Sequence, residues 1–165
     1  MSGRYVAVVG PSGDPGPEVL ALAEEVGRLL AAAGALVVTG GGSGVMEAAS
    51  RGAAGVGGQV VGILAGTDRR EANPYVTVAL ATGLGEVRNA LVVRAADVVV
   101  SVGGSWGTLS EVALACRTGV PVVALAGWDL PDGDGPVVAA DPAEAARLAL
   151  VPSGDPAGGQ GHRPA

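Results

Sequence analysis

One stretch of the sequence constrains the fold more than any other: residues 98–111 pass from an apolar run through a glycine-rich turn into the start of a helix. The run Val98–Val102 is typical of a buried strand, and from Leu109 onward apolar residues recur at helical spacing. Such a junction turns main-chain N–H groups and the positive end of the helix dipole toward an anion, most often a phosphate. The stretch therefore predicts a strand whose carboxyl end carries an anion-binding turn, with Glu111 in the first turn of the helix.

A second junction of the same kind occurs earlier in the chain. Leu36–Thr39 reads as a strand, Gly40–Gly44 as its turn and Val45–Ser50 as the start of a helix. Two such junctions can lie side by side at one sheet edge, with both helix N-termini facing one ligand. Glycines that only permit tight turns are the alternative. Neither loop is a strict dinucleotide motif and no Walker lysine follows either, which argues against a P-loop NTPase.

Strand and helix patterns alternate from Tyr5 to Leu150, which predicts an α/β fold: a single doubly wound, Rossmann-like parallel sheet with helices on both faces. The chain has 165 residues and only four aromatic ones, so its core is expected to consist of Val, Leu, Ile and Ala. We expect one nucleotide-binding domain over residues 1–151. Residues 152–165 are rich in Gly and Pro without periodicity, which indicates a disordered tail.

Charge and composition exclude several classes of function. The net charge is −6 and basic residues form no stripe, which argues against a nucleic-acid partner. The single cysteine, Cys116, excludes an internal disulfide, and the single histidine, His162, lies in the tail. A Cys/His metal site and a Ser-His-Asp hydrolase are therefore not expected. No secretory signal and no long uncharged apolar run occur, so we expect a cytoplasmic protein that does not enter a membrane.

Three side chains near the loops have both a functional and a purely structural interpretation. Glu111 can complete a capping box with Thr108, or act as an acid beside a bound substrate. Arg88 can lie on a solvated helix face or contact the ligand. Trp106 can be a hydrophobic lid on the strand ends or a stacking platform for a base.

These motifs resemble those of a known family. Gly103–Glu111 resembles the P-G-G-x-G-T-x-x-E motif of the LOG family, the cytokinin riboside 5′-monophosphate phosphoribohydrolases, and Gly40–Met46 is similar to that family's first glycine motif. Arg88 stands before Asp97 where the family places a catalytic arginine. The similarity is greatest to the subgroup that includes molybdenum cofactor carrier proteins, through the segments Gly44–Ala48, Asn73–Tyr75, Thr82–Gly85, Arg88–Asn89 and Gly107–Glu111. Four motif positions differ from the phosphoribohydrolases: Asn89, Gly103, Ser105 and Ser110.

The resemblance implies hydrolysis of the N-glycosidic bond of a nucleoside 5′-monophosphate, which releases the free base and ribose 5-phosphate. It also implies an alternative, a non-catalytic carrier of a phosphorylated ligand such as molybdenum cofactor; a nucleotide-sensing module is a third reading. Hydrolysis would use Arg88 and Glu111 and need neither metal nor cofactor. The expected partners are a small phosphorylated ligand and further copies of the chain, in a homodimer or homotetramer. The residues expected to bind the ligand are Gly41, Gly42, Ser43, Gly44, Met46, Asn89, Gly103, Gly104, Ser105, Trp106, Gly107 and Thr108.

Overall fold

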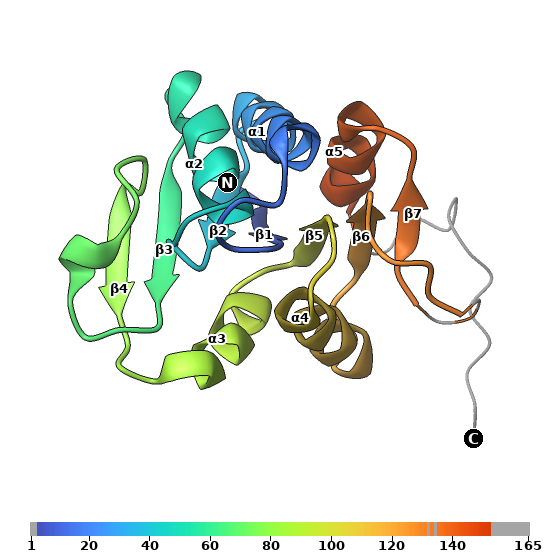
Figure 1. Cartoon of the computed structure of the whole chain (residues 1–165). Helices are drawn as coiled ribbons and strands as arrows, with labels where there is room; N and C mark the ends of the chain where they lie inside the picture. The colour runs from blue at the N-terminus through green and yellow to red at the C-terminus, as the bar shows by residue number, and fades with distance from the viewer. Residues whose placement is uncertain (1–2, 132, 134, 153–165) are drawn as a thin grey trace.

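Seven parallel strands form one sheet in the order β4-β3-β2-β1-β5-β6-β7 (Figure 1). The structure is a computed structural model that describes residues 3–131, 133 and 135–152. The strands are β1 (Tyr5–Val9), β2 (Leu36–Thr39), β3 (Val60–Leu64), β4 (Val78–Ala81), β5 (Val98–Val102), β6 (Val122–Leu125) and β7 (Val137–Ala139). The strand order reverses at β1, because the chain adds β2, β3 and β4 on one side of β1 and then β5, β6 and β7 on the other.

Helices cover both faces of the sheet, as Figure 1 shows: α1, α2 and α5 lie on one face, and α3 and α4 on the other. They span α1 (Pro17–Ala32), α2 (Val45–Gly55), α3 (Arg88–Arg94), α4 (Trp106–Arg117) and α5 (Pro142–Leu150), with short 3-10 turns η1 (Arg69–Glu71) and η2 (Gly85–Val87). The predicted Rossmann-like α/β fold is confirmed.

Valine fills the centre of the sheet because both of its faces are covered. Along β1, Val6 and Val8 pack under α1, α2 and α5, whereas Ala7 and Val9 pack against the α3 and α4 side. β-branched residues fit this pleated, doubly buried position well. The two apolar layers hold the strand ends in fixed register, and the loops at the carboxyl edge depend on that register.

The structure differs from the predicted elements mainly at their ends. Apolar and polar residues alternate over residues 75–81, a pattern that predicts a strand from Tyr75 to Ala81, but β4 begins only at Val78. The sequence pattern of residues 86–95 predicts a helix from Glu86 to Ala95, but its first turn is the 3-10 turn η2 and α3 begins at Arg88. The edge strand β7 is missing from the sequence prediction, because its three residues follow a Gly/Asp/Pro-rich loop and pair only with β6. The predicted tail lies outside the described residues from position 153 onward.

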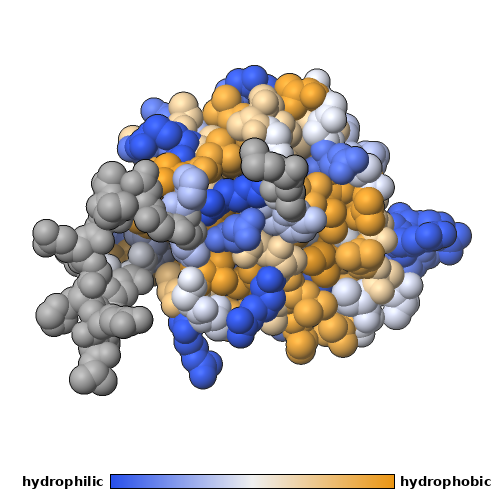
Figure 2. Space-filling view, turned by 180° about the vertical axis from the view of Figure 1, so that it is seen from behind, coloured by the Kyte–Doolittle hydropathy of each residue, from blue (hydrophilic) through white to orange (hydrophobic). Residues whose placement is uncertain are grey.

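Within the described residues, no helix is both long and apolar enough to cross a membrane. An exposed apolar group does occur around α3, and Figure 2 shows hydrophobic residues gathered at the lower right of the molecule, over α3 and the turn before it. Leu84, Val87 and Leu91 are exposed there, Val87 by 69%. Contiguous exposed apolar surface of this kind marks contact sites between proteins.

We expect this patch to pair copies of the chain. If copies of the chain pair through this patch, Val87→Glu should give a smaller species than the wild type, because a carboxylate is costly to bury without a partner. Val138→Glu is the matched control, since Val138 on β7 is 77% exposed at the far edge of the sheet. Light scattering coupled to gel filtration gives the masses. A monomeric wild-type chain, or equal dissociation by both variants, would contradict this assignment.

Candidate functional site

Three loops meet at the carboxyl edge of the sheet, where the strand order reverses. The two predicted glycine loops follow β2 and β5, and β1 lies between these strands, so the junctions share one edge but are not neighbours. The loop after β1 joins them: Val45 N donates to Pro11 O at 3.0 Å, and Gly13 N donates to Ser43 Oγ at 3.1 Å. A Cβ on Gly103 would lie 3.4 Å from the Pro11 ring. Sequence reasoning missed this third loop, although every strand of a parallel sheet adds a loop to the same edge.

The loop after β2 is held by buried polar groups. Thr39 Oγ1 accepts a hydrogen bond from Gly41 N at 3.0 Å. Asn73, 8% exposed, donates its main-chain N–H to Gly41 O at 2.8 Å and its amide to Gly42 O at 2.9 Å. Gly41 and Gly44 have φ of 72° and 68°, a region that side chains disfavour. Asn73 therefore positions this loop. The sequence analysis did not predict this role, although Asn73 belongs to the motif segment Asn73–Tyr75.

Arg88 lies beneath the same loop. One guanidinium nitrogen, Nη1, donates to Gly40 O and to Ile63 O, both at 2.6 Å. Arg88 Nε is buried and has no hydrogen-bond partner among the residues that the structure describes. Burial lowers the pKa of Arg88, while the charge of Glu111 raises it. Of the two interpretations of Arg88, the solvated helix face is wrong, because the guanidinium contacts the ends of β2 and β3.

Two predicted ligand-binding residues flank this arginine. Met46, in the first turn of α2, lies against Gly40, where a Cβ would be 2.6 Å from its Sδ. Asn89 follows Arg88 on α3, is partly buried, and its side chain makes no hydrogen bond within the described part of the chain. The structure thus brings Met46 to the loop but gives Asn89 no partner there.

Glu111 lies in the second turn of α4 and does not cap the helix. The N-cap is Ser105, whose Oγ accepts from Thr108 N at 3.2 Å and lies 2.9 Å from Thr108 Oγ1. The predicted capping box with Thr108 as its first residue is therefore wrong, because the N-cap is Ser105, three residues earlier, and the helix begins at Trp106. Burial of the carboxyl raises the pKa of Glu111 to about 7, although the nearby Arg88 charge lowers it. Glu111 can therefore exchange a proton near neutral pH.

The first turn of α4 presents main-chain N–H groups that have no acceptor within the helix. Thr108 N is bonded to the Ser105 side chain, and Leu109 N donates to Ser105 O at 2.8 Å. Trp106 and Gly107 begin the helix, so their N–H groups have no acceptor within it. These two donors lie at the positive end of the helix dipole and can bind an anion. In α2, by contrast, the first N–H is used by Pro11.

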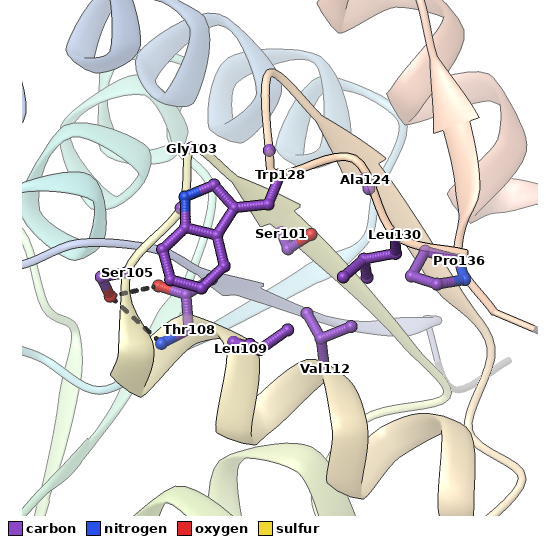
Figure 3. Close-up of a pocket in the computed structure, with 12 residues that line it drawn as sticks. Ser101, Gly103, Ser105, Thr108, Leu109, Val112, Ala124, Trp128, Leu130 and Pro136 are labelled. Carbon is purple, nitrogen blue, oxygen red and sulfur yellow. Dashed lines mark hydrogen bonds between the residues drawn. The ribbon is translucent and has the colours of Figure 1, made fainter.

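Two tryptophans flank this turn. Trp106 is 80% exposed, and its ring centroid lies 5.0 Å from that of Trp128 in an edge-to-face arrangement, at 74°. Figure 3 shows the Trp128 indole projecting from the loop between β6 and β7 over the start of α4. It covers a cavity of about 20 Å³, which has room for about one water molecule. The lining includes Ser101, Leu109, Val112, Leu130 and Pro136.

The remaining reactive groups do not join the site. Cys116 is a partly buried free thiol whose pKa is raised by burial, as expected for a structural cysteine. Within residues 3–131, 133 and 135–152, no three His, Cys, Asp or Glu side chains gather in a metal-binding group. The site is thus made of main-chain donors, one arginine, one glutamate and two indoles.

Comparison with known proteins agrees with this architecture over the whole described chain. The model of the SLOG cluster4 family matches residues 3–151. The chain belongs to the SLOG cluster4 family. The expected resemblance to the LOG family, and within it to the molybdenum cofactor carrier subgroup, is confirmed by this match and by the structural neighbours.

Two solved structures similar to this SLOG cluster4 chain are molybdenum cofactor proteins. The molybdenum cofactor binding protein of Rippkaea orientalis is 36% identical, with 90% of this chain and 96% of that chain covered and a TM-score of 0.85. The molybdenum cofactor carrier protein of Chlamydomonas reinhardtii is 34% identical, with 88% and 95% covered and a TM-score of 0.79. An uncharacterised protein of Archaeoglobus fulgidus is 38% identical over 125 residues, 76% of this chain and 82% of that protein.

Proposed function

We propose that this SLOG cluster4 chain binds a phosphorylated pterin of the molybdenum cofactor type and carries it without hydrolysis. Arg88 supports carriage over hydrolysis, because its Nη1 is already bonded to Gly40 O and Ile63 O. An arginine held in this way braces the loop and has fewer donors left to orient a substrate. The similarity to two molybdenum cofactor proteins, each covered over at least 95% of its length, supports the same choice of cargo.

The phosphate of the cargo would bind to the turn before α4. Trp106 N and Gly107 N are the donors that the helix leaves unpaired. The chain as a whole is acidic, with a net charge of −6, so main-chain dipoles rather than a basic patch would supply the attraction. Two N–H groups at fixed positions bind a single phosphate group. An acidic chain without a basic patch repels a polyanion, so we expect a small phosphorylated ligand.

Hydrolysis of a nucleoside 5′-monophosphate is the second candidate, and Glu111 favours it. A carboxyl group whose pKa burial raises to about 7 can take a proton from water at neutral pH. Its negative form could also stabilise the positive charge that develops on ribose when an N-glycosidic bond breaks. In this case Glu111→Gln should lower turnover by about a hundredfold or more, with nucleotide affinity retained.

Both candidates need the phosphate turn, so we expect Gly103→Val to abolish stabilisation by phosphorylated ligands. Gly103 has φ of 72°, and a Cβ there would lie 3.0 Å from Val19. A branched side chain should therefore shift the turn that precedes Trp106. Saturating neopterin monophosphate or GMP should raise the Tm of the wild type by several degrees, and the unphosphorylated compounds should not.

Gly119→Val is the matched control. Gly119, at the other end of α4, has φ of 77° with open space around its Cβ position, so the variant carries similar backbone strain away from the turn. It should lose stability but keep the ligand-dependent shift. Equal shifts from neopterin and its monophosphate would contradict the phosphate turn.

Product analysis separates the two candidate functions. Carriage predicts saturable binding of neopterin monophosphate and no release of base from AMP or GMP, measured by chromatography. Release of free base and ribose 5-phosphate by the wild type, lost in Glu111→Gln, would replace carriage by hydrolysis.

A further inference from the structure

Trp106 occupies an unusual position for an indole. It is the most exposed of the large hydrophobic residues described, at 80%, and it is the first residue of α4. Its own main-chain N–H is one of the two donors at the phosphate turn. The Trp106 ring is exposed to water beside these donors. A flat ligand that covers the ring removes apolar surface from water, which stabilises the complex.

Trp106 is also braced from behind by a second loop. Trp128 meets it edge to face, with the ring centroids 5.0 Å apart, a geometry that the quadrupoles of two aromatic rings favour. Trp128 is in turn packed over Gly104, where a Cβ would lie 2.7 Å from indole Cδ1 and Nε1. The two indoles and the glycine turn therefore form one preorganised unit built from two separate loops.

The cavity between Trp128 and the start of α4 is too small to hold a ligand ring. Its volume of about 20 Å³ is enough for about one water molecule and far too small for a bicyclic ring (Figure 3). A planar ligand can instead cover the exposed surface that Trp106 offers on the solvent side of the pair.

We propose that Trp106, braced by Trp128, is the stacking platform that selects planar bicyclic heteroaromatic ligands whose phosphate binds the adjacent turn. The inference rests on the proposed function for the phosphate contact and adds the ring as the second recognition element. Trp106 supplies both the stacking surface and one phosphate donor, so the ligand must join ring and phosphate by a short linker. Pterin phosphates and purine nucleotides share this chemistry, and a sugar phosphate without a ring lacks it.

The test compares the affinities of three probes for wild type and Trp106→Ala by titration calorimetry. Neopterin monophosphate and GMP carry a bicyclic ring, and ribose 5-phosphate carries none. Trp106→Ala should weaken binding of the two ring-bearing compounds by about tenfold to a hundredfold, the scale of one lost aromatic–base stack. It should change the affinity for ribose 5-phosphate by less than about twofold. Trp106→Phe should restore most of the loss, and Val138→Ala, at an exposed apolar site on β7, should have no effect.

Fluorescence gives an independent readout, because Trp106 and Trp128 are the only two tryptophans in the chain. Neopterin monophosphate should quench the emission of Trp128→Phe, in which Trp106 is the sole indole, more strongly than that of Trp106→Phe. Circular dichroism confirms that each variant is folded, and the Trp106→Phe result stands if Trp106→Ala does not fold. The ratio of the affinities for neopterin monophosphate and GMP shows whether Trp106 prefers a pterin or a purine ring.

The outcomes distinguish the platform from the phosphate turn. Equal weakening for ribose 5-phosphate and the ring-bearing probes would overturn the platform and leave the phosphate turn in place. If wild type binds none of the three, the proposed function fails together with the platform.

Discussion

Glu111→Gln is expected to stabilise the protein by on the order of 3 kcal/mol above pH 7 and to leave its stability almost unchanged near pH 4. Burial raises the pKa of Glu111 from 4.5 in the unfolded chain to about 7 in the folded one. Between these values the folded state holds a proton that the unfolded state has lost, so wild-type stability falls as pH rises through this window. Above pH 7 the folded chain must hold a charged, poorly hydrated carboxylate, which glutamine avoids.

Chemical denaturation at a series of pH values measures this difference in the free energy of unfolding. It should grow from about pH 4.5 to about pH 7 and then remain constant. Glu18→Gln is the control for the loss of one negative charge, because Glu18 is exposed on α1, on the face of the sheet opposite to the apolar patch around α3. If the difference in the free energy of unfolding between Glu111→Gln and wild type did not change with pH, the Glu111 carboxyl would be as well hydrated in the folded chain as in the unfolded chain.

Gly52→Ala is expected to destabilise the protein by on the order of 3 kcal/mol, because α1 and α2 leave no room for a methyl group there. A Cβ on Gly52 would overlap Glu24 O and lie 2.9 Å from Arg28 N, both main-chain atoms of α1. Gly27 is equally close to the main chain of Ala49 from the other side, so the two helices touch through their glycines. Main-chain atoms cannot rotate away as a side chain can, and the helices must separate.

Thermal unfolding should show a Tm lower by roughly 6–12 °C for Gly52→Ala. Gly55→Ala, on the same helix with open space at its Cβ position, is the matched control and should be neutral or stabilising by up to about 1 kcal/mol. A similar Tm for the two variants would show that the helices can move apart without cost. This contact also places the start of α2, and with it the loop after β2, at the carboxyl edge.

The local elements and the fold class follow from patterns that the sequence carries by itself. The apolar runs Tyr5–Val9, Leu36–Thr39 and Val122–Leu125 coincide with β1, β2 and β6. The order Asp141-Pro142-Ala143-Glu144 is typical of a helix start, and Asp141 is the N-cap of α5. Strand and helix periodicity and capping are set by neighbours a few residues apart, so they can be read from the chain. The rule that loops of a parallel sheet meet at its carboxyl edge then places both glycine turns.

The chemistry of the site was decided only by the tertiary structure. The carbonyls that hold the Arg88 guanidinium come from residues 48 and 25 positions away, and no local pattern predicts which acceptors a long side chain reaches. The shift in the pKa of Glu111 comes from burial of its carboxyl, opposed by the charge of Arg88 on α3. Trp106 and Trp128 meet because β5 and β6 are adjacent strands whose loops fold toward each other. Desolvation, charge and ring contacts arise between segments distant in sequence, and they exist only once the sheet has brought those segments together.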